Sequence, residues 1–187
     1  MPGSTSLLAE PLGPSLGIQA QLPILLAEYP FRTQQDIADY LHLLQDLPRY
    51  FSDLIALEQE KSRQGVFQND LAVDGIIRQC SAFLADADTP ESHLLHTVFQ
   101  NKLQASSLFS EAERNLCLQT HEKLLTSCVF PAYRSLSDAL SSLRGKGTQN
   151  AGGLSRQEDG LSYYAYLLRS RVGVDASPEE LTRLLTQ

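Results

Sequence analysis

The sequence predicts an all-α protein, a multi-helix bundle, for this chain of 187 residues. Apolar residues recur at steps of three and four through most of the chain, which is the spacing of one helix face. Helix-capping signatures precede several of these stretches, and no β-rich alternating stretch with hairpin turns competes with them. A hydrophobic content of 42% can bury the core of one domain, or can belong to one large piece of a bigger protein.

Residues 1–30 are predicted to form an extended, proline-rich lead-in. Proline removes a backbone donor and disfavours the helical conformation of the preceding residue. The apolar run from Leu22 to Leu26 is unlike a solvated linker, so we expect the lead-in to pack on the helical body. The prolines of this segment are Pro2, Pro11, Pro14, Pro23 and Pro30.

Residues 31–187 are predicted to form the helical domain. Thr33 is the expected cap of a first helix, and Pro48 either divides it from a second helix or kinks one helix that ends near Gly65. Another helix is expected to begin near Asn69, and a fourth at the cap and proline of Thr89-Pro90-Glu91.

The second half of the chain shows two capping-box spacings. Ser110 and Glu113 predict a helix that runs to about Val129, after which Pro131 starts or kinks a further segment. A loop is predicted at 145–153, followed by a helix with an inward stripe of Leu161, Tyr164, Ala165 and Leu168.

A last helix is expected from Ser177-Pro178-Glu179-Glu180. A newly capped amphipathic helix normally runs for more than two turns, yet the sequence ends at Gln187. The domain is therefore expected to be truncated at its carboxyl end.

The charge and the absence of long apolar runs argue against several partners. A formal net charge of -7 with scattered basic residues argues against nucleic acid, and no stretch is long enough for a membrane span. We expect a soluble protein without a signal peptide in the chain as given. Three cysteines, Cys80, Cys117 and Cys128, are expected to be buried free thiols.

No complete catalytic motif is present. The pair His121-Glu122 lacks the second histidine of a zinc peptidase helix, because Leu125 stands in its place. His93 with His96, and Cys117 with His121, have the spacing of metal-ligand pairs. The expected alternative is that His93 is exposed near a helix start, His96 is partly buried, and Cys117 and His121 face the core. No catalytic residue and no metal ligand are therefore assigned to this chain.

Several segments together resemble the bacterial domain-of-unknown-function 885 family, which is grouped with zinc-metallopeptidase-like folds. The carboxyl-terminal segments are the most specific of them, and the resemblance covers most of the chain. The segments that carry it are 17–23, 26–31, 39–41, 48–51, 129–133, 152–154, 160–164, 167–169 and 177–181.

The resemblance implies that this chain is an amino-terminal helical part of a larger metallopeptidase-like fold. Family members are larger, and their presumed metal-binding helix lies downstream of the region matched here. No cofactor is expected in this chain, whereas zinc is expected in the parent protein. The chain alone would be inactive and would form one wall of the parent's peptide-binding cleft.

Candidate cleft residues lie in the segments that carry the resemblance. Tyr163 and Tyr164 combine an apolar ring with a polar tip, which suits a groove, although core packing is the simpler role. Arg169 lies one to two turns further along the same predicted helix.

Two functional hypotheses remain open from the sequence. The first is the non-catalytic fragment of a zinc-dependent peptidase-like protein, whose partner is the missing carboxyl-terminal part of the parent and whose parent would act on a peptide substrate. The alternative is a self-contained helical module for protein interaction or oligomerisation, which would bind a partner or a second copy of the chain. The compartment, bacterial cytoplasm or the destination of an exported parent, is left open.

Overall fold

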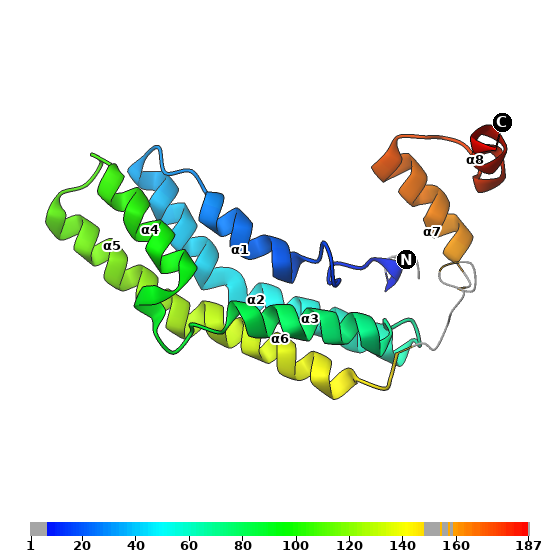
Figure 1. Ribbon diagram of the computed structural model, residues 1–187, viewed down its shortest axis with the longest axis horizontal. Helices are drawn as coiled ribbons and strands as arrows, with labels where there is room; N and C mark the ends of the chain where they lie inside the picture. The colour runs from blue at the N-terminus through cyan, green and yellow to red at the C-terminus, as the bar shows by residue number, and fades with distance from the viewer. Residues whose placement is uncertain (1–6, 148–153, 155–156, 158, 187) are drawn as a thin grey trace.

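The longest helix, α2 (Gln34–Arg63), extends along the bundle shown in Figure 1. The computed structural model describes residues 7–147, 154, 157 and 159–186. Thr33 caps α2 as expected, since its hydroxyl accepts from Asp36 N and its own N–H donates to the Asp36 carboxylate at 2.8 Å. Pro48 lies inside α2 and does not divide it. One helix therefore forms where the sequence left two possibilities.

Helix α1 (Ile18–Glu28) corrects the expectation of an extended lead-in over residues 1–30. Pro23 has no N–H and so leaves the carbonyl of Gln19 without its helical partner. The buried Tyr133 hydroxyl donates to that same carbonyl at 2.9 Å. A tertiary hydrogen bond thus replaces the one that the proline removes, which the local sequence could not indicate.

A second rod consists of α5 (Glu111–Leu124), a π-helical turn (Leu125–Val129) and α6 (Phe130–Leu143). The Ser110–Glu113 capping box begins it, as predicted. The N–H of Phe130 donates to the carbonyl of Leu125, five residues earlier, directly before Pro131. A wider turn of this kind accommodates a residue that cannot donate, so the helix continues through the proline.

Helices α3 (Asp70–Phe83) and α4 (Leu94–Ala105) connect α2 to the α5–α6 rod, and α3 packs against α6 while α4 packs against α5 (Figure 1). Asn69 caps α3 as predicted, with its side chain accepting from Ala72 N at 3.0 Å. Thr89-Pro90-Glu91 begins only a short 3₁₀ turn, Pro90–Ser92, and His93 caps α4 instead. The Ser92 hydroxyl donates to the Thr89 hydroxyl at 2.8 Å, which ends the first turn early.

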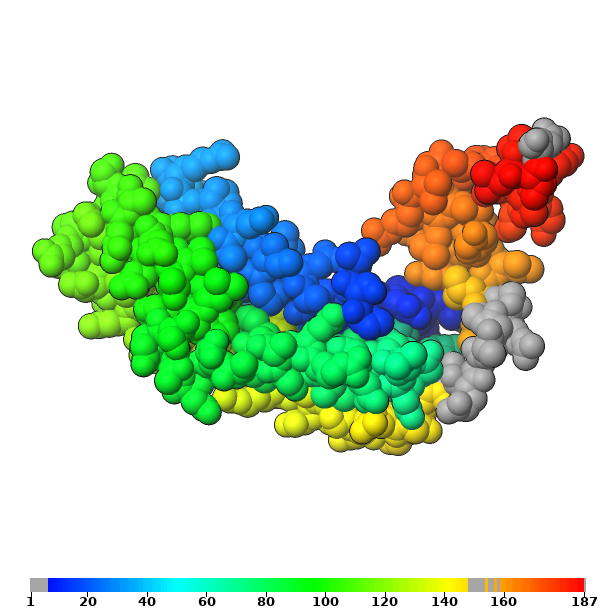
Figure 2. Space-filling view, viewed as in Figure 1, coloured from blue at the N-terminus to red at the C-terminus, as the bar shows by residue number. Residues whose placement is uncertain are grey.

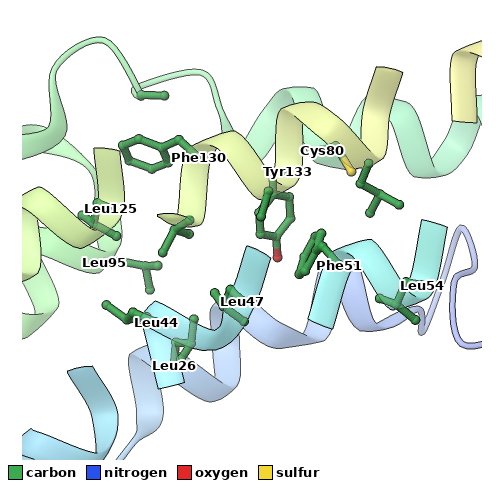
Figure 3. Close-up of a cluster of buried hydrophobic side chains, with 14 of the residues drawn as sticks. Leu26, Leu44, Leu47, Phe51, Leu54, Cys80, Leu95, Leu125, Phe130 and Tyr133 are labelled. Atoms are coloured by element: carbon green, nitrogen blue, oxygen red, sulfur yellow. The ribbon is translucent and has the colours of Figure 1, made fainter. Parts of the chain in front are cut away.

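Aromatic rings of α2, α3 and α6 meet in the bundle, and Figure 3 shows those of Phe51 on α2 and Tyr133 on α6. The ring of Tyr133 lies 4.8 Å from that of Phe51 and 4.1 Å from that of Phe83, measured between centroids. Such pairs are worth about 0.5–1.5 kcal/mol beyond the apolar area they bury. The core therefore joins α2, α3 and α6 directly.

Helices α7 (Gly160–Leu167) and α8 (Pro178–Leu185) follow the bundle and lie at one end of it (Figure 1). Ser177 and Glu180 form the predicted capping box of α8. The predicted inward stripe of α7 is wrong, because Leu161 is 67% exposed and Tyr164 41% exposed, although Leu168 is buried. Most of the predicted loop at 145–153 lies outside the described residues.

None of the helices among the described residues is long and apolar enough to cross a membrane.

Truncation of Phe51 should reveal how much the bundle depends on this aromatic centre. Phe51→Ala is expected to lower the free energy of unfolding by about 3–5 kcal/mol, because it leaves a cavity beside Tyr133. Urea denaturation measures this change, and Leu116→Ala, at a residue 65% exposed, should change stability by no more than about 0.5 kcal/mol. Equal losses in the two variants would contradict the assigned core.

Candidate functional site

A cavity of about 560 Å³ lies where α7 meets the end of the bundle, and we take it as the candidate functional site. Its walls come from the segment before α1, from α2, and from the helix that contains Tyr163. Apolar side chains form most of the lining, while Glu10, Tyr163 and Arg171 supply polar groups. The lining residues are Leu8, Ala9, Glu10, Pro11, Leu54, Leu57, Leu154, Tyr163, Leu167 and Arg171.

The chain before α1 is held in place by a buried leucine and by hydrogen bonds from two helices. Leu12 is fully buried, and the Lys61 ammonium donates to the Ala9 carbonyl at 3.1 Å. Gln79 donates to the Pro14 carbonyl at 2.6 Å. Ala9 is therefore bonded to α2 and Pro14 to α3, so the segment that forms this wall is part of the folded bundle.

Lys61 and Glu58 form a buried ion pair next to this wall. Their side-chain atoms approach to 3.5 Å, and both residues are almost completely buried. Burial raises the pKa of Glu58, while Lys61 and Gln68 lower it and Glu10 raises it. Desolvation thus disfavours the charged pair, and the Lys61 ammonium stabilises the buried Glu58 carboxylate.

A second cavity, of about 400 Å³, adjoins the first. Lys61, Phe67 and Ala72 help to line it, and Leu8, Glu10 and Leu154 line both cavities. The segment before α1 therefore contributes to two neighbouring hollows.

Leu154 positions the start of α7. A side chain at Gly160 would bring its Cβ to 1.6 Å from the Leu154 carbonyl oxygen, so only glycine fits here. Leu154 in turn lines the candidate cavity. This close approach sets where Tyr163, one turn later, meets the bundle.

The structure brings together only part of the predicted cleft set. Tyr163 lines the cavity, whereas Tyr164 and Arg169 are exposed and do not line it. Arg171 lines the cavity and was missed. It lies four residues after Leu167, which lies four after Tyr163, and this helical spacing could have pointed to it.

Burial and nearby charges shift the pKa of the Tyr163 hydroxyl. Burial raises the pKa of Tyr163, the Glu10 carboxylate and Tyr166 raise it further, and the Arg171 guanidinium lowers it. Both an acidic and a basic group therefore act on the same phenol from the rim of the cavity.

The residue pairs with metal-ligand spacing do not fit zinc. The two ring nitrogens of His93 are bonded to the Phe83 carbonyl and to Leu95 N–H. His121 Nε2 shares a hydrogen bond of 3.1 Å with the Tyr40 hydroxyl, and its ring stacks on Phe99 at 4.2 Å. Among the described residues, no group of three or more His, Cys, Asp or Glu side chains could hold a metal ion.

His121 is instead a buried, neutral member of the core. Burial, followed by the nearby His96 and His93, lowers its pKa from 6.5 to about 3. Of the three thiols, all free, Cys80 is buried as predicted, while Cys117 and Cys128 are only partly buried. Burial raises the pKa of the Cys80 thiol to about 12.

The fold and the cavity define an all-α helical protein with a hollow between its bundle and its carboxyl-terminal helices. The model of the family described as bacterial protein of unknown function (DUF885) matches residues 5–187, so the chain belongs to this family. The family resemblance of the sequence is thereby confirmed. No curated protein matches the chain.

The fold is similar to a crystal structure described as "the putative lipoprotein from Colwellia psychrerythraea". The TM-score is 0.78 at 18% sequence identity, with 91% of this chain covered. At this identity the similarity concerns the fold alone. The matched region spans 29% of the length of that protein.

The buried ion pair gives a first prediction for the site. Lys61→Met should lower the free energy of unfolding by about 3 kcal/mol, because it leaves Glu58 buried without its cation. The double variant Lys61→Met with Glu58→Met should recover most of the loss. Urea unfolding of the unmodified chain, Lys61→Met, Glu58→Met and the double variant forms a double-mutant cycle. Additive losses of stability would contradict the coupling.

The buried imidazole gives a second prediction, on pH. The folded pKa of His121 is below its unfolded value, so its contribution to stability is complete above pH 6.5 and is lost as pH falls toward 3. At about pH 5 the loss from this group should be about 2 kcal/mol.

Unfolding curves of His121→Phe and of the unmodified chain, measured from neutral pH down to about pH 5, test this expectation. The variant should lose less stability across that range, whereas a His42→Asn control, at an exposed residue, should behave like the unmodified chain. Parallel curves for His121→Phe and the unmodified chain would refute the prediction.

Proposed function

We propose that this chain is the non-catalytic, amino-terminal helical part of a zinc-dependent peptidase-like protein, and that it forms one wall of the parent's substrate cleft. Two observations support the proposal. The chain belongs to the DUF885 family, and the similar crystal structure is more than three times as long as the region it shares with this chain.

The proposal that this chain forms one wall of the cleft is based on the hollow between α1 and the helices α7 and α8 (Figure 2). Large apolar side chains of these three helices are exposed, although a chain that folds alone would tend to cover them. They are Ile24 and Leu25 on α1, Leu161, Tyr164 and Tyr166 on α7, and Leu184 and Leu185 on α8. On this proposal the remaining helices of the parent pack against them.

Zinc, on the same proposal, is bound by residues of the parent outside this chain. His93 and His121 form hydrogen bonds within the core, so no catalytic step is assigned to them. The contribution of this chain is to shape the cleft.

The test is complementation between the chain and the remaining, carboxyl-terminal part of a full-length family member. Co-expression should yield a one-to-one complex in which amide exchange of α7 and α8 slows, with zinc-dependent peptidase activity in the complex and none in this chain. The paired substitution Leu161→Asp and Leu185→Asp should prevent assembly, whereas Leu71→Asp, at a residue 79% exposed on α3, should not. Failure to assemble with an intact remainder would refute the proposal.

The alternative function is a self-contained module for protein interaction or oligomerisation, and the same exposed apolar residues favour it. A second copy of the chain would then cover α7 and α8. Sedimentation velocity separates the two ideas, because a dimer that persists at low micromolar concentration supports the module and a monomer supports the proposed fragment.

A further inference from the structure

We infer that the cavity between α2 and α7 binds a small zwitterion with an apolar side chain, of the class of the free apolar α-amino acids. The inference concerns this chain alone and does not depend on the peptidase-like parent. It is based on three features of the cavity, namely its size, its apolar walls and the two opposite charges at its rim.

The size and walls suit a small apolar body. A volume of about 560 Å³ lies within the range of roughly 300–1,000 Å³ that small-molecule sites occupy. Leu54 and Leu57 of α2 and Leu167 of α7 line it, together with Leu8 and Pro11 from the segment before α1. An aliphatic side chain would be removed from water here without the loss of a hydrogen bond.

The rim holds one carboxylate and one guanidinium that have no ionic partner. Within the described part of the chain, neither Glu10 nor Arg171 forms an ion pair, with each other or with another residue. Both line the same cavity as Tyr163, and both affect the pKa of its hydroxyl. Two opposite charges that flank one cavity without neutralising each other are complementary to a ligand that has both charges at one end.

The chemistry then assigns each part of the ligand. The planar Arg171 guanidinium receives the carboxylate, because Arg presents several N–H donors in a geometry that matches two oxygens. Glu10 accepts from the ammonium, and Tyr163 lines the same cavity as these two charges. The side chain enters between Leu57 and Leu167. A simple carboxylate or a simple amine would use only one of the two charges.

The test is an NMR titration of the full chain with L-leucine and three analogues that each lack one group. The analogue 4-methylpentanoate lacks the ammonium, 3-methylbutylamine lacks the carboxylate, and glycine lacks the apolar side chain. Leucine should give saturable shifts at Leu57, Tyr163 and Leu167, and each analogue should bind about five- to tenfold more weakly.

Variants separate the cavity from general surface charge. Arg171→Gln should weaken leucine binding by about tenfold but leave binding of 3-methylbutylamine unchanged, and Glu10→Gln should weaken the amine and not 4-methylpentanoate. Arg169→Gln is the matched control, since Arg169 is exposed on the same turn and does not line the cavity. All three sites are exposed, so thermal unfolding should be unchanged.

Three outcomes would overturn the inference. They are the absence of saturable shifts with leucine, equal binding of leucine and glycine, and equal losses in Arg169→Gln and Arg171→Gln. The complementation of the chain with a longer parent has no influence on this titration, so each idea can fail without the other.

Discussion

The ammonium of Lys61 is the group on which the architecture around the candidate site depends. It lies almost completely buried near the end of α2, where it approaches the Glu58 carboxylate and donates to the Ala9 carbonyl. Without it a buried carboxylate would have no cation, and residues 8–11 would lose a contact that fixes them to the bundle. Both cavities share Leu8 and Glu10 as lining, so their shape follows from this one charge.

Most of the bundle could be predicted from the sequence because its signals are local. Thr33, Asn69 and Ser110 lie directly before helices and cap them in the structure, as their side chains indicated. The wrong predictions concern segments in which a distant residue replaces an interaction that the local sequence lacks. Pro23 should interrupt a helix, yet Tyr133, 110 positions later in the chain, supplies the hydrogen bond that keeps α1 intact. No pattern within residues 1–30 contains that information.

Only part of the candidate site could be predicted from the sequence, for a related reason. Tyr163 was identified from its chemistry and the family resemblance, and the structure places it at the cavity. Its neighbour Tyr164 and the more distant Arg169 point elsewhere, because the face of α7 that meets the bundle is set by Gly160 and Leu154. The apolar periodicity of α7 indicated Leu161 as buried, and periodicity cannot distinguish a face that packs on this chain from one left open.

The sparse packing of α7 has a consequence for how the site can change. Helices α1–α6 contact one another extensively, whereas α7 has its main contact with the π-helical turn that follows it. Opening of α7 should therefore require much less free energy than unfolding of the bundle. Substitutions on the α7 side of the cavity would therefore disturb the packing of the bundle little. The lining of the cavity can change in evolution while the bundle itself stays the same.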